Sequence, residues 1–153
     1  MGAIKNFIDE LAKHKLLVYF VFLWGAMLFL WTLYGLIEWG FEISGVLGVL
    51  DLLYHLSELF AGLLLMLVGI KLMMPNILAA IKTEKITIYF LLLWAGSFFF
   101  GGLWDIVDSG PWLFEYWNEW LAVLGGLASL FAGVALALFC WKMLTAGAEQ
   151  KSQ

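Results

Sequence analysis

The residues best suited to chemistry form a polar stripe in an otherwise apolar stretch of the chain. Asp51, His55 and Glu58 follow i, i+4, i+7 spacing, so on a helix they lie along one face over about two turns. Helical bundles build metal sites from inward carboxylates and imidazoles, including Glu-x-x-His pairs. Here the order is reversed, His55-x-x-Glu58. These ligand types suit Mn, Fe, Zn or Cu, so the stripe predicts a divalent transition metal as a cofactor.

Further acids are candidates to face this stripe from neighbouring helices. Asp105 lies near the end of the third apolar run and Glu119 just before the fourth. The predicted metal-binding set is therefore Asp51, His55, Glu58, Asp105 and Glu119.

The alternative is a structural polar cluster. Acids at a span boundary are then hydrated charges at headgroup level, and His55 forms a hydrogen bond within the bundle. Glu58 and Asp105 fit this alternative least well, because a charge in the hydrocarbon region costs several kcal/mol unless it is paired, neutralised or hydrated.

The composition predicts that a lipid bilayer surrounds the elements that hold these residues. Of 153 residues, 64% are hydrophobic and 13% are charged, and the mean hydropathy is +0.96. A soluble domain carries about 25% charged and about 45–50% apolar residues. The composition excludes a soluble enzyme, a nucleic-acid-binding protein and a disordered chain.

Four apolar runs have the length of a transmembrane helix, which is about 20 residues. They cover residues 16–39, 52–73, 86–107 and 120–144. A helix satisfies its own backbone hydrogen bonds in lipid, so we predict an all-α integral membrane protein with a single domain over residues 1–153. Before the first run, Ile4, Phe7, Ile8 and Leu11 share one face of a short amphipathic segment, which suits a helix in the inner membrane interface.

The lysines predict the orientation. All eight basic residues are lysines, and none falls in residues 40–51 or 109–119. The positive-inside rule places both termini and the 74–85 connection in the cytoplasm. Eight of the twelve acids lie on the opposite, outer side or in the outer part of a span, among them Glu42 and Glu115.

The chain also repeats itself with a shift of about 70 residues. The tetrapeptide 59–62 recurs as 130–133, Lys15 matches Lys85, and Trp24 matches Trp94. We predict a tandem repeat of two helical hairpins, over about 1–73 and 74–144, followed by a short tail over 145–153. Such repeats are related by an axis along the membrane normal, which predicts a four-helix bundle with a pseudo-two-fold axis. Trp24 and Trp94 either pack on each other, line a quinone or pigment pocket, or face lipid.

The function stays open between several hypotheses. No P-loop, nucleophile elbow, HExxH or haem-attachment motif is present, so the sequence leaves open whether the protein is an enzyme. The first hypothesis is a small subunit or accessory protein of a larger membrane complex, with other membrane subunits or further copies as partners. The second is a metal-binding or quinone-linked redox protein. The third is a cation or proton channel or transporter that uses Glu58.

Overall fold

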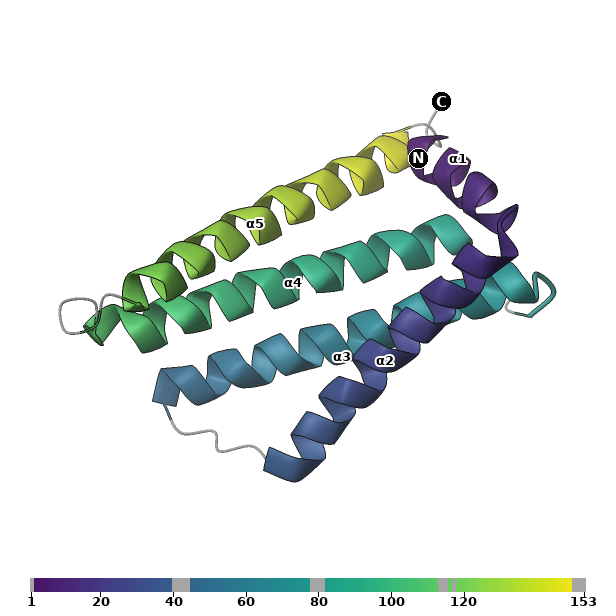
Figure 1. Cartoon of the computed structure of the whole chain (residues 1–153). Helices are drawn as coiled ribbons and strands as arrows, with labels where there is room; N and C mark the ends of the chain where they lie inside the picture. The colour runs from purple at the N-terminus through teal and green to yellow at the C-terminus, as the bar shows by residue number, and fades with distance from the viewer. Residues whose placement is uncertain (1, 40–44, 78–81, 113–115, 117, 150–153) are drawn as a thin grey trace.

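The computed structural model is all-helical over the residues it describes, which are 2–39, 45–77, 82–112, 116 and 118–149. A short helix, α1 (Gly2–Ala12), precedes four long ones: α2 (Lys15–Trp39), α3 (Gly45–Met73), α4 (Thr83–Ser109) and α5 (Glu119–Glu149). A 3₁₀ turn, η1 (Gly110–Trp112), follows α4. Figure 1 shows the long helices, with the start of α1 and the end of α5 at the same end of the molecule.

The four predicted spans are confirmed as helices long and apolar enough to cross a membrane. The helices extend beyond the apolar runs, because a helix also satisfies its backbone among polar residues at the membrane surface. The largest difference is at α3, which begins at Gly45 instead of residue 52. Gly45 has a φ of 71°, a left-handed conformation that glycine adopts readily. Asp51 therefore lies within a helix and not in the preceding loop.

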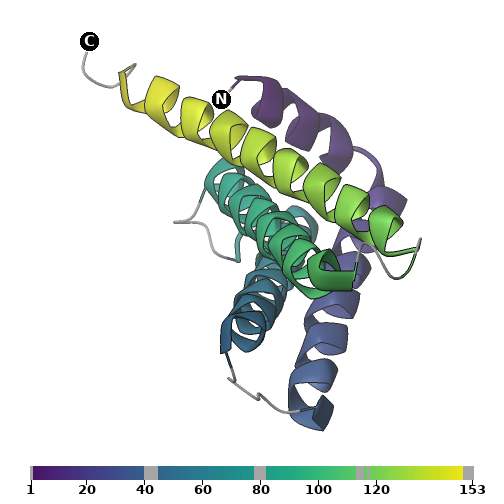
Figure 2. The ribbon, with the colours of Figure 1, turned by 90° about the vertical axis from the view of Figure 1, so that its left-hand side faces the viewer.

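The helices form an open row in which neighbours in sequence are neighbours in space. The extensive contacts are α2 with α3, α3 with α4, and α4 with α5. Among the described residues, α2 and α5 form no extensive contact. Figures 1 and 2 show α5 at one edge of the row and α2 at the other, with α2 diverging from α3 toward Trp39.

Close backbone approaches hold each hairpin together. A Cβ added at Gly62 of α3 would lie 2.6 Å from the backbone nitrogen of Phe29. A Cβ at Gly133 of α5 would lie 2.7 Å from the Ala95 carbonyl oxygen and 2.8 Å from the Phe99 nitrogen. Small residues allow membrane helices to approach this closely, so glycine is required at both crossings.

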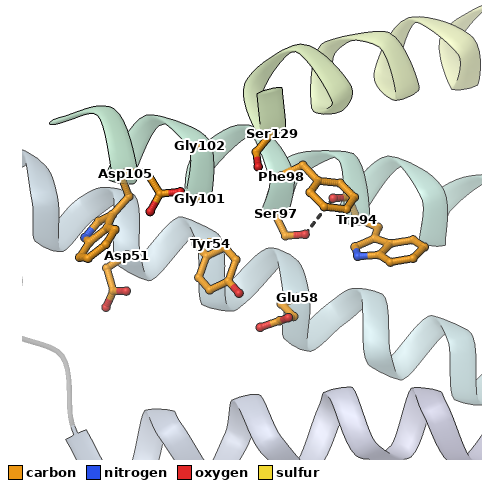
Figure 3. Close-up of a pocket in the computed structure, with 11 residues that line it drawn as sticks. Asp51, Tyr54, Glu58, Trp94, Ser97, Phe98, Gly101, Gly102, Asp105 and Ser129 are labelled. Atoms are coloured by element: carbon orange, nitrogen blue, oxygen red, sulfur yellow. Dashed lines mark hydrogen bonds between the residues drawn. The ribbon is translucent and has the colours of Figure 1, made fainter. Parts of the chain in front are cut away.

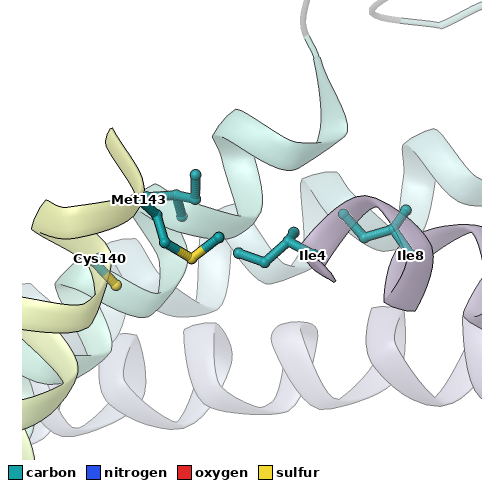
Figure 4. Packing of buried hydrophobic residues seen from close by; sticks show 5 residues of the cluster. Ile4, Ile8, Cys140 and Met143 are labelled. Atoms are coloured by element: carbon teal, nitrogen blue, oxygen red, sulfur yellow. The ribbon is translucent and has the colours of Figure 1, made fainter. Parts of the chain in front are cut away.

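The amphipathic segment docks on the long helices at the end where α4 begins and α5 ends. Ile4 and Ile8 of α1 are buried in one cluster with Ile88 of α4 and with Cys140 and Met143 of α5 (Figure 4). Phe7, predicted on the same apolar face, is 64% exposed. The helix thus buries one half of its apolar face in protein and leaves the other half outside.

Candidate functional site

A cavity of about 400 Å³ lies between α3 and α4, toward the end where α3 begins and α4 ends. Its polar lining consists of acids, hydroxyls and a phenol: Asp51, Tyr54, Glu58, Ser97, Asp105 and Ser129. Its aromatic lining consists of Trp94, Phe98 and Trp104. Figure 3 shows the α3 side chains across from those of α4, with Ser129 reaching the site from α5.

Helical spacing explains why these residues meet. Asp51, Tyr54 and Glu58 have i, i+3, i+7 spacing on α3 and so share one face. On α4, two adjacent glycines have different neighbours. A Cβ at Gly101 would lie 3.2 Å from the ring of Tyr54, whereas a Cβ at Gly102 would collide with the backbone oxygen of Gly126 on α5. Gly101 therefore makes room for the Tyr54 ring, and Gly102 allows α5 to approach α4 closely, where Ser129 joins the lining.

Glu58 is held by a residue that sequence reasoning missed. The Thr32 hydroxyl on α2 donates a hydrogen bond of 3.1 Å to Oε2 of Glu58, and Thr32 is only 1% exposed. The signal available in the sequence was a threonine hydroxyl within an apolar run. Because the partner lies on another helix, its spacing to Glu58 gave no indication of the contact.

Of the three residues in the predicted stripe, His55 is the one that lies outside the cavity lining. His55 Nδ1 lies 3.2 Å from Oδ1 of Asp51 and 2.9 Å from the Asp51 backbone oxygen. Its ring meets that of Tyr54 edge-on, with centroids 5.0 Å apart. His55 is not part of the cavity lining, so this side chain interacts with its own helix.

The five predicted metal-binding residues therefore lie in different places. Asp51, Glu58 and Asp105 line the cavity, whereas His55 lies beside it. Glu119 accepts a hydrogen bond of 3.1 Å from Asn118 Nδ2 and is not among the lining residues. Within the described part of the chain, no three His, Cys, Asp or Glu residues are placed to hold one metal ion. Glu42 and Glu115 lie outside the described residues.

An aromatic wall closes one side of the cavity. Trp94 stacks on Phe98 with centroids 5.6 Å apart and 28° between the rings. Trp94 also meets Trp24 of α2 edge-on at 5.4 Å, so these two rings pack on each other, and Trp94 lines the cavity as well. One turn further along α3 and α4, Ala61, Leu65 and Phe90 form a buried apolar cluster. The polar cavity therefore ends at a layer of apolar side chains.

The charged side chains of the described lining are all acidic. It includes carboxylates from both helices, at Asp51, Glu58 and Asp105, and the described lining contains no lysine. A cleft lined by one sign of charge with apolar walls concentrates the opposite charge. The arrangement is suited to attract and hold a cation.

A second, apolar groove lies between α4 and α5. It has a volume of about 550 Å³, and its described lining contains no ionisable side chain. Phe99, Phe100, Leu138 and Trp141 are among its residues. Its apolar lining resembles the exposed apolar surface of the helices and differs from the lining of the acidic cavity.

Comparisons with protein-family models, with curated proteins and with solved structures find no match to this chain.

Proposed function

We propose that this chain is a small integral membrane protein that binds a cation in the cavity between α3 and α4. The observation that carries the proposal is the lining itself, which brings Asp51, Glu58 and Asp105 around one space of about 400 Å³. Thr32 supports the same function because its hydrogen bond fixes Glu58 at the inner end of that space.

We infer that the cation enters from the outer side. Lys15, Lys71, Lys85 and Lys142 lie at the starts of α2 and α4 and at the ends of α3 and α5. Under the positive-inside rule this end is cytoplasmic, as are both termini, and the cavity then lies in the outer half. The apolar cluster of Ala61, Leu65 and Phe90 separates it from the cytoplasmic end. This layer favours a binding site open to the outside over a continuous channel.

The orientation is tested by cysteine labelling in a Cys140→Ser background. Lys13→Cys and Trp112→Cys each place one thiol at an exposed position at opposite ends of the molecule. In intact cells a membrane-impermeant maleimide should label Trp112→Cys, and should label Lys13→Cys only after permeabilisation. The reverse pattern contradicts the orientation.

The cation site is tested by calorimetric titration of the purified protein with sodium, potassium, calcium, manganese, zinc and choline chlorides. Glu58→Gln should weaken the binding of whichever cation binds by about tenfold or more, since it removes a charge paired with the ligand. Glu119→Gln is the matched control, because Glu119 is an acid outside the lining and its loss should leave affinity unchanged. If no cation binds, or if both variants behave alike, the proposal is wrong.

We further propose that the hairpins α2–α3 and α4–α5 are a duplicated unit, as the sequence repeat predicts. The support is that equivalent glycines make equivalent contacts: Gly62 meets Phe29, and Gly133 meets Phe99. One pair differs. Thr32 and Glu58 of the first hairpin correspond to Gly102 and Ser129 of the second, which line the cavity. The cavity is thus lined by the positions where the second hairpin has smaller side chains than the first. A two-fold bundle would also pair α2 with α5, and among the residues that the structure describes this contact is not extensive.

A second candidate function is that of a subunit in a larger membrane assembly. The specific observation is that α2 and α5 are both edges of the row. Along α5, Gly125, Ala128 and Ala132 are exposed small residues, a composition suited to close helix contact. Native mass spectrometry of the protein gently solubilised from its own membranes should detect a second copy or another chain. A bare monomer contradicts this candidate.

A further inference from the structure

The structure assigns the α3–α4 cavity to a small organic ammonium ion. This inference rests on the proposed function, since it names the class of cation that the site would take. It depends on the size of the space, on its aromatic walls and on the way its carboxylates are distributed.

The space is larger than a bare ion requires. At about 400 Å³ it falls in the range of about 300–1,000 Å³ that is typical of small-molecule sites. A metal ion bound by protein oxygens needs six or so ligands at about 2–2.6 Å. The carboxylates instead come from separate turns and helices, and within the described part of the chain they form no group that would hold a metal ion.

The lining is rich in aromatic rings. Trp94 packs between Phe90 and Phe98, with centroid distances of 5.2 and 5.6 Å. The candidates to present a ring face to a ligand are therefore Phe98, Tyr54 and Trp104, which also belong to the lining. The face of a tryptophan or tyrosine ring attracts alkylammonium groups, and aromatic cages recognise quaternary ammonium ligands. An inorganic ion with a tightly held hydration shell gains less from such walls than an ion that presents methyl groups.

The charges complement an ion of this type. Glu58 lies at the inner end of the lining beside Trp94, and Asp51 lies about 10 Å further along α3, given a rise of about 1.5 Å per residue. Glu58 is anchored by Thr32, so it offers a fixed negative charge next to an aromatic wall. A carboxylate and ring faces around one space bind the charge and the alkyl groups of an ammonium ion together.

The test uses protein in maltoside detergent, titrated calorimetrically with choline and with dimethylbutanol, its uncharged carbon analogue. Choline should bind, and dimethylbutanol should bind at least about tenfold more weakly. Equal affinity for the two would overturn the inference, because the site would then recognise shape without charge.

The aromatic contribution is tested separately. Phe98→Leu should weaken choline binding about two- to thirtyfold while the affinity for an inorganic cation stays unchanged. Phe98 is 37% exposed, so this variant is expected to fold. Trp94→Leu is a larger change, because the Trp94 ring also packs on Trp24 and Phe90. The control is Trp141→Leu, since Trp141 lies on α5 and is 68% exposed. Unchanged choline affinity in folded Phe98→Leu and Trp94→Leu would overturn the inference.

The same titrations separate this inference from the proposed function. The protein could bind sodium or a divalent metal but not choline, and Glu58→Gln could abolish that binding. This result overturns the ammonium assignment and leaves a cation site. If no cation binds, both the proposed function and the ammonium assignment are wrong.

Ammonium groups occur on free amines and on lipid headgroups. Tighter binding of a short-chain phosphatidylcholine than of choline identifies a lipid source, and equal or weaker binding identifies a free amine; either result supports the assignment.

Discussion

Thr32 of α2 and Glu58 of α3 are joined by a hydrogen bond of 3.1 Å, in which Thr32 is almost fully buried. This bond links the edge helix α2 to the wall of the acidic cavity. It gives Glu58 a partner in an apolar environment, where a polar group without one is costly. The stability of the hairpin and the position of the charge are thus coupled through one hydroxyl.

Thr32→Val should weaken both properties. Valine keeps the shape and removes the donor, and hydrogen bonds between membrane helices contribute on average about 0.6 kcal/mol and at most about 2 kcal/mol. Unfolding in mixed SDS micelles, followed by tryptophan fluorescence, should show a loss in that range, together with weaker cation binding. Thr87→Val is the control, because Thr87 donates only to the Thr83 carbonyl of its own helix. Equal effects of the two substitutions would show that the link between α2 and α3 has no special role.

Gly62→Ala should destabilise the first hairpin, whereas Gly125→Ala should not. A Cβ at Gly62 would lie 2.6 Å from a backbone nitrogen of α2, while one at Gly125 meets nothing within 4 Å. Overpacking of this type costs about 1–3 kcal/mol, and alanine in an open helix position gains up to about 1 kcal/mol. The same SDS unfolding curves measure both changes. If Gly62→Ala is neutral, the close α2–α3 crossing is incorrect.

Ile8→Ala should release α1 from the long helices, and Phe7→Ala should have little effect. Ile8 is 6% exposed in the cluster with Met143, whereas Phe7 is 64% exposed. Removing a buried isoleucine side chain costs about 2–5 kcal/mol in well-packed cores. Hydrogen exchange of the α1 amides is the measurement, and faster exchange only in Ile8→Ala is expected. Equal exchange in both variants would mean that α1 is held mainly by the membrane surface.

The sequence predicts the four spanning helices well because each depends on a local property, the length of an apolar run. It predicts Glu58 and Asp105 as candidates because acids inside spans are costly, and Asp51 because its spacing places it on the same helix face as Glu58. These three do line one cavity. The sequence misses Thr32, Phe98 and Trp104, and for Trp94 it leaves a pocket as one of three alternatives, because these roles depend on which helices are neighbours. It also groups His55 and Glu119 with the site, since helical spacing alone does not show that His55 contacts Asp51 or that Glu119 lies outside the lining.

His55→Gln should leave cation binding in the cavity nearly unchanged, while Asp105→Asn should weaken it. His55 interacts with Asp51 beside the cavity, whereas Asp105 is part of the lining and its charge acts on the bound ion directly. Two further carboxylates, Asp51 and Glu58, remain in the lining, so Asp105→Asn should reduce affinity by about two- to tenfold. The effect should diminish as sodium chloride is raised, because salt screens partly exposed charges. Calorimetric titration at low and high salt measures the affinity of each variant and its dependence on sodium chloride. A larger loss from His55→Gln than from Asp105→Asn would instead favour the imidazole–carboxylate metal site that the sequence predicts.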